Sequence, residues 1–81
     1  MEKISYTKEM AKAIRQVKAP YKGVIIDIRR RPNYLAVVVH EENIMEFSQE
    51  QRMNIMEYLL QVREMIQNFG VRCEIEGIKY A

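Results

Sequence analysis

The residues best suited to chemistry in this 81-residue chain are the three consecutive arginines Arg29–Arg31, followed closely by Tyr34. A guanidinium is a planar fork of donors that matches phosphate oxygens, and a tyrosine ring can stack on a base. Proline and asparagine stand between Arg31 and Tyr34, at the second and third positions of a tight turn, which both residue types favour. The sequence therefore predicts a basic hairpin tip that contacts either a nucleic acid or an acidic protein surface.

A second basic set lies near the start of the chain, where Lys8, Lys12 and Arg15 repeat at helical spacing. Such a face either docks on an anionic partner or is simply a solvated helix surface. Residues 1–40 carry nine basic against three acidic side chains, whereas residues 41–81 carry four against eight. This asymmetry predicts one basic side of the molecule, or opposed charges that attract one copy to another.

Catalytic chemistry has weaker support. His40 is the only histidine, and it is expected near Asp27 on the outer face of a hairpin, but no credible nucleophile accompanies the pair. Ser48 is better explained as a helix cap, and Cys73 is expected on the inner face of a strand, opposite to His40. A cysteine–histidine enzyme needs both groups on one side. We therefore expect a protein that is not an enzyme.

No cofactor or metal site is expected either. Four polar strand residues would gather into a site for a hard cation only if the last strand lay beside the first; these are Asp27, His40, Glu74 and Glu76. Solvated polar side chains on a sheet are the simpler interpretation. The three glycines stand too far apart for a phosphate-binding loop. No small-molecule substrate is evident.

The stretch 47–70 predicts one long helix. Ser48 is a suitable N-cap, and Gln51, three residues later, completes a capping box. Asn68 and Gly70 are suited to the helix end. An apolar face repeats at spacings of three and four and predicts the core contact; it comprises Ile55, Leu59, Val62, Ile66 and Phe69. The flanking Met53, Met56 and Leu60 either widen this face or reach a partner.

A first helix is expected to begin at a cap, Ser5 or Thr7, and to run to about Lys18. The following Ala19-Pro20 stops it, because the residue before a proline is pushed away from helical geometry.

Three strands are expected at Tyr21–Arg30, Leu35–Glu41 and Val71 to about Gly77, since apolar residues recur there at every second position. If Arg31 opposes Tyr34, Ile28 faces Val37 and Ile26 faces Val39, all on the core side. The other side of the sheet mixes apolar and polar residues. It is a candidate interface, or it is covered by the ends of the chain.

These elements predict one α+β domain over residues 1–81, in the order helix-strand-strand-helix-strand (αββαβ), with a three-stranded sheet packed on two helices in two layers. The length suffices for a modest core without disulfides. Cys73 is the only cysteine, which is consistent with a reducing cytoplasm. We expect no membrane span, because no long apolar run occurs.

The function that this sequence favours is a small binding protein that acts by stoichiometric association. Its contact residues would be Arg29, Arg30, Arg31 and Tyr34, supported by Lys8, Lys12 and Arg15. Partners would be nucleic acid or the acidic surface of a nucleic-acid-handling protein, as for a small regulator or inhibitor of the phage or bacterial type. The alternative is a structural or assembly protein that forms homo-oligomers through a sheet edge, the outer sheet face or the long helix.

Overall fold

The computed structural model describes residues 5–40 and 44–77. Its elements follow the predicted order: α1 at Lys8–Arg15, β1 at Ile26–Arg30, β2 at Leu35–Val39, α2 at Gln49–Gln67 and β3 at Cys73–Glu76. The fold is therefore the small α+β domain that the sequence predicts.

The long helix α2 begins at the predicted capping box. The Ser48 hydroxyl accepts from the backbone N–H of Gln51 at 3.2 Å, and the Gln51 side chain accepts from the backbone N–H of Ser48 at 2.9 Å. Each bond satisfies a donor that the first helical turn would leave unpaired. Gly70 follows the helix with a φ of 81°, a conformation that favours glycine.

The sheet has the predicted register. Arg31 N–H donates to the Tyr34 carbonyl at 2.9 Å, and Ile28 pairs with Val37 and Ile26 with Val39 in the antiparallel pair β1–β2. The sequence left the position of the last strand open. The structure places β3 parallel to β2 on the side away from β1, so the strand order is β1-β2-β3.

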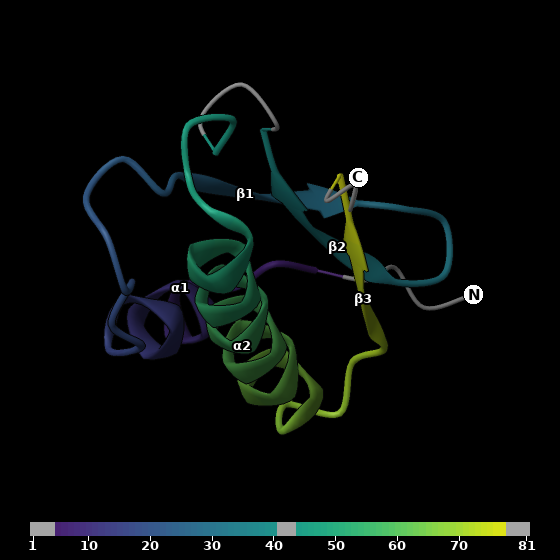
Figure 1. The fold of residues 1–81 in the computed structure, drawn as a ribbon. Helices are drawn as coiled ribbons and strands as arrows, with labels where there is room; N and C mark the ends of the chain where they lie inside the picture. Colours follow the sequence, from purple (N-terminus) through teal and green to yellow (C-terminus); the bar gives the residue numbers. More distant parts are fainter. Residues whose placement is uncertain (1–4, 41–43, 78–81) are drawn as a thin grey trace.

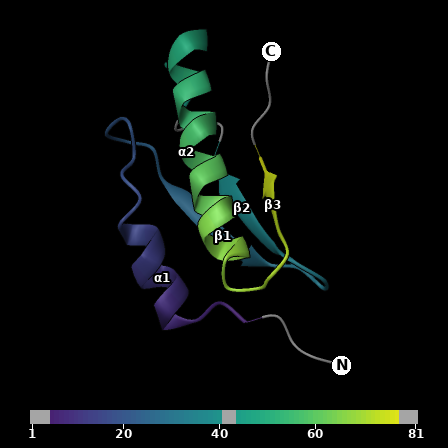
Figure 2. The same ribbon diagram turned by 90° about the horizontal axis from the view of Figure 1, so that it is seen from below.

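Both helices cover the same face of the sheet (Figures 1 and 2), as a two-layer domain requires. The core lies between the helices and the sheet. Its fully buried side chains come from β2, α2 and β3, with Ile44 from the connection; they are Leu35, Val37, Val39, Ile44, Ile55, Leu59, Val62, Ile66 and Cys73. Helix α1 adds Met10 and Ile14 and packs mainly on α2. The opposite face of the sheet carries no helix among the described residues.

Several elements are shorter than predicted. Helix α1 is capped by Thr7 and ends at Arg15 rather than Lys18, because Gln16 and Val17 bond three residues back and tighten the last turn. Strand β1 begins at Ile26 rather than Tyr21, after a turn in which Gly23 has a φ of 90°. Strand β2 ends at Val39, and β3 spans Cys73–Glu76 rather than starting at Val71. The expected extension of β2 to Glu41 falls partly outside the described residues.

Across the two described segments, no helix has both the length and the apolar character needed to cross a membrane.

Candidate functional site

Four arginines and a tyrosine meet at one end of the sheet, where β1 ends and β2 and β3 begin. Arg29 and Arg30 close β1, Arg31 and Tyr34 flank the turn, and Arg72 directly precedes β3. The Leu35 N–H donates to the Arg72 carbonyl at 2.9 Å, which ties the start of β3 to the start of β2. We call these five residues the basic end.

Glu76 holds two of the five in place. Its Oε1 accepts from Arg31 Nη2 at 2.7 Å, and its Oε2 accepts from the Tyr34 hydroxyl at 2.7 Å. These bonds, the Tyr34 bond foremost, lower the pKa of the Glu76 carboxyl below its ordinary value. The same contacts raise the pKa of the Tyr34 hydroxyl and of the Arg31 guanidinium. Arg31 and Tyr34 are therefore held by the protein itself and are not free at a hairpin tip.

The geometry of this cluster explains a buried residue on the open face. Glu76 pairs with Val38, whereas Tyr34 lies two residues before Ala36 on the same side of the sheet. The side chains that meet at Glu76 must therefore reach along the sheet past Ala36. Ala36 is fully buried, although no helix covers its face in the described part of the chain.

Arg72 completes the basic end from the third strand. Its guanidinium carbon lies 5.5 Å from the centre of the Tyr34 ring, within the range of a cation–π contact. A longer contact of 3.6 Å joins its Nε to Glu74 Oε1, and the side chain remains 66% exposed. Sequence reasoning missed Arg72. The alternation in residues 71–76 placed it on the outer face, but only the strand order brings it beside Tyr34.

Arg29 and Arg30 are exposed and form no salt bridge within the described residues. The sequence treated the three consecutive arginines alike. The structure divides them, since Arg31 is paired with Glu76 while its two neighbours keep their charge towards solvent. Arg29, Arg30 and Arg72 are thus the exposed cations of the basic end.

The basic face of α1 is a separate surface. Lys8, Lys12 and Arg15 are largely exposed, as expected. In both ribbon views α1 and the turn between β1 and β2 lie on opposite sides of α2 (Figures 1 and 2). The structure therefore does not bring the two sets of basic residues together into one contact area.

His40 and Asp27 meet as the sequence suggested, with His40 Nε2 2.7 Å from Asp27 Oδ2. Both side chains are partly exposed, at 39% and 45%. Cys73 is fully buried on the other face of the sheet, and burial raises the pKa of its thiol to about 11. Ser48 caps α2. The His40–Asp27 pair thus has neither Cys73 nor Ser48 as a neighbouring nucleophile.

The cation site considered from the sequence requires the last strand to lie beside the first. The structure does not meet this condition, because β3 lies beside β2 and not beside β1. Glu76 instead binds Arg31 and Tyr34. Within residues 5–40 and 44–77, no three His, Cys, Asp or Glu side chains are placed to hold a metal ion together.

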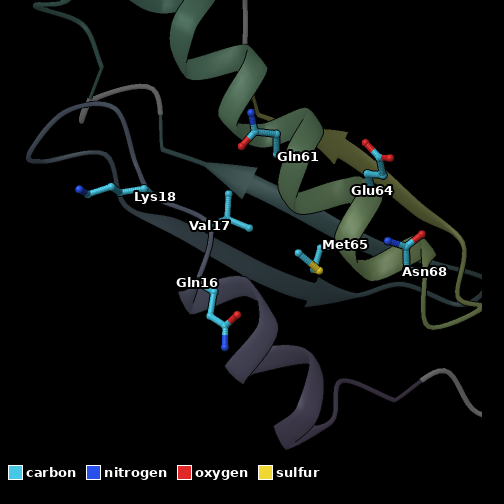
Figure 3. A pocket seen from close by; sticks show the side chains of 7 residues that line it. All are labelled: Gln16, Val17, Lys18, Gln61, Glu64, Met65 and Asn68. Atoms are coloured by element: carbon cyan, nitrogen blue, oxygen red, sulfur yellow. The ribbon is translucent and has the colours of Figure 1, made fainter.

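A pocket of about 380 Å³ opens between the end of α1 and the second half of α2 (Figure 3). Its lining is mixed and mostly uncharged; it comprises Gln16, Val17, Lys18, Gln61, Glu64, Met65 and Asn68. Among these side chains only Lys18 and Glu64 are ionisable. The pocket shares no residue with the basic end, and we assign it no function.

No family model, curated protein or solved structure matches this chain in comparisons with known proteins.

Proposed function

We propose that this chain is a small, non-enzymatic binding protein that docks the basic end of its sheet on the phosphate backbone of a nucleic acid. The observation that carries the proposal is the placement of exposed arginines from two strands at one end of the sheet. Arg29 and Arg72 belong to the open face, whereas Arg30, which pairs with Leu35, lies at the same end on the other face. Phosphate contacts of this kind supply most of the affinity of non-specific nucleic-acid binding.

Tyr34 supports this choice of partner. Its ring lies on the open face with Arg72 beside it, and its hydroxyl is fixed by Glu76. A fixed aromatic ring flanked by cations is the arrangement with which proteins hold single strands, through stacking and backbone charge. In this proposal Arg31 and Glu76 position Tyr34, and the exposed arginines contact phosphate.

A protein of this kind would act as a regulator or inhibitor by occupying its partner in a stoichiometric complex. The single cysteine, buried as a thiol, is consistent with the reducing conditions of a cytoplasm.

The test is an anisotropy titration of labelled single- and double-stranded RNA and DNA, at low and at physiological salt. We expect an association constant whose logarithm falls linearly with the logarithm of salt concentration. Replacement of Arg29, Arg30 and Arg72 with alanine should weaken binding. The salt slope should fall by about one for each guanidinium–phosphate pair that the variant removes.

The matched control is the triple variant Lys8→Ala, Lys12→Ala, Arg15→Ala, which removes the same charge from the separate face of α1. It should bind almost as the parent does. Equal weakening in the two variants would show that binding follows net charge and not the basic end. Absence of binding at low salt would overturn the nucleic-acid proposal and leave an acidic protein surface as the partner of these arginines.

The second candidate function is self-association through a sheet edge. The observation that favours it is the outer edge of β1, which no described strand pairs.

A further inference from the structure

The outer edge of β1 presents unpaired backbone groups in a regular pattern. Arg31 and Tyr34 form a hydrogen-bonded pair, and in an antiparallel ladder such pairs alternate with non-bonded ones. Arg29 and Asp27 therefore turn their backbone groups towards β2. Ile26, Ile28 and Arg30 turn their N–H and C=O groups outward, where the described residues supply no neighbouring strand.

A second copy of β1 could pair on this edge only in a few registers. A two-fold axis perpendicular to the sheet keeps each face on its own side, so residues that oppose each other must share a face. The axis therefore lies level with one residue of β1, which then opposes its own copy, and not between two consecutive residues. Only an axis at Ile28 pairs the whole strand, Ile26 to Arg30, with its copy.

The charges of β1 favour that same register. An axis at Ile28 places Asp27 opposite Arg29 of the second copy, and Arg29 opposite its Asp27. These would be non-hydrogen-bonded pairs, in which side chains approach most closely. An axis at Asp27 would oppose two aspartates, and an axis at Arg29 would oppose two arginines, both of which are unfavourable.

We propose that a second copy of this chain pairs antiparallel with β1, centred on Ile28, so that one sheet runs without a break through both copies. The pairing gives hydrogen-bond partners to the outward groups of Ile26, Ile28 and Arg30. It also covers the partly exposed side chains of Ile26 and Ile28 at the edge. Arg72 lies on the opposite edge strand and stays open to a further partner, whereas Arg29, one of the phosphate contacts proposed above, is paired with Asp27 of the second copy.

The contact is short, since β1 has five residues. An interface much smaller than the ~1,200 Å² typical of stable complexes gives a weak dimer, and we expect a dissociation constant in the micromolar range. Sedimentation equilibrium from low micromolar to near-millimolar protein should therefore show a monomer–dimer transition. A monomeric mass throughout would overturn the proposal.

Charge reversal tests the register. Asp27→Arg and Arg29→Asp each turn both opposite-charge pairs of the homodimer into like-charge pairs, which should weaken dimerisation about tenfold or more. An equal mixture of the two variants restores both pairs and should form a heterodimer. The double variant Asp27→Arg, Arg29→Asp should self-associate like the parent. Single variants that dimerise normally, or a mixture that stays monomeric, would overturn this register.

A cross-link gives an independent readout in case a charge variant does not fold. Opposed residues of a hydrogen-bonded pair have Cα atoms about 5.5 Å apart, within the range of a disulfide. Ile28→Cys should therefore form a covalent dimer on mild oxidation. Ile26→Cys, which opposes Arg30 of the second copy, should not, and the parent offers only the buried Cys73. Equal cross-linking of both variants, or of neither, would contradict pairing centred on Ile28. No nucleic acid is present in these measurements, so their outcome is independent of the proposed nucleic-acid contact.

Discussion

Glu76 holds two side chains of the open sheet face in place, because its carboxylate accepts hydrogen bonds from both Arg31 and Tyr34. The lowered pKa of its carboxyl determines whether the stability of the fold rises or falls with pH. A carboxyl whose pKa is lower in the folded protein stabilises the fold fully above its unfolded pKa of about 4.3. That contribution is lost as the pH falls through the lower, folded pKa. At acid pH the contacts of Glu76 with Arg31 and Tyr34 should therefore weaken.

Tyr34→Phe tests the hydrogen bond that contributes most to the lowered pKa of Glu76. The variant removes the hydroxyl donor and leaves Arg31, so the pKa of the Glu76 carboxyl should rise towards its ordinary value. Carbon-detected NMR titration of the Glu76 carboxyl measures this directly. Tyr21→Phe is the control, since the Tyr21 hydroxyl bonds Asn54 and not Glu76. An unchanged Glu76 pKa in Tyr34→Phe would show that the hydroxyl does not bond this carboxyl in solution.

Individual residues mark the limit of what the sequence predicts about the site. The turn and the arginine cluster were visible because they are contiguous. The contacts of Arg31 and Tyr34 with Glu76 span 45 and 42 positions, and no local pattern signals them. His40 and Asp27 were paired correctly because both lie in one hairpin, where the turn fixes the register.

At the level of elements, β3 depends on the glycine that follows it. Gly77 has a φ of 89°, and a Cβ added there would lie 2.8 Å from the Val39 carbonyl oxygen, at the end of β2. Gly70 also has a positive φ but faces open space. The two glycines thus separate backbone strain from steric overlap with a neighbouring strand.

Alanine at each position should reveal this difference. Gly70→Ala should cost about 1 kcal/mol of unfolding free energy, from the left-handed backbone alone. Gly77→Ala adds the overlap with Val39 and should cost roughly 2 kcal/mol or more. Urea unfolding monitored by circular dichroism measures both. Equal losses would mean that the end of β3 moves away from β2 at little cost.

Element types were predictable because their signals are local. The Ser48–Gln51 capping box and the alternation of apolar and polar residues in β3 each act over a few residues. Element ends were less predictable, since pairing partners limit them. Strand β1 begins at Ile26 because that residue pairs with Val39, the last residue of β2. Ile25 lies outside the ladder and is 58% exposed, although its residue type suits a strand.

For the whole molecule, the two-layer architecture followed from the sequence, but the order of the strands did not. Every apolar face needed a partner, and only one sheet face could be covered by two helices. In the structure β3 pairs with β2, and α2 packs against both strands. This strand pairing brings Arg72 to Tyr34 and leaves β1 as an open edge. The proposed nucleic-acid contact and the proposed dimer both depend on it.

The packing of the layers also predicts which part opens first. Helix α1 has eight residues, fewer than an isolated helix needs for stability in water. It is held mainly against α2, through Met10 and Ile14, whereas α2 also packs on β2 and β3. We therefore expect α1 to undock while the sheet and α2 remain folded.

Native-state hydrogen exchange of Ile14→Ala measures this separation. Amides of α1 should lose most of their protection, while those of β2 stay protected. The global unfolding free energy should fall by less than the ~2–5 kcal/mol expected for Leu59→Ala, which opens a cavity in the fully buried core. The loss of unfolding free energy in Ile14→Ala is smaller because it cannot exceed the free energy with which α1 docks on the rest of the domain. Parallel loss of protection in α1 and β2 would show instead that the domain unfolds as one unit.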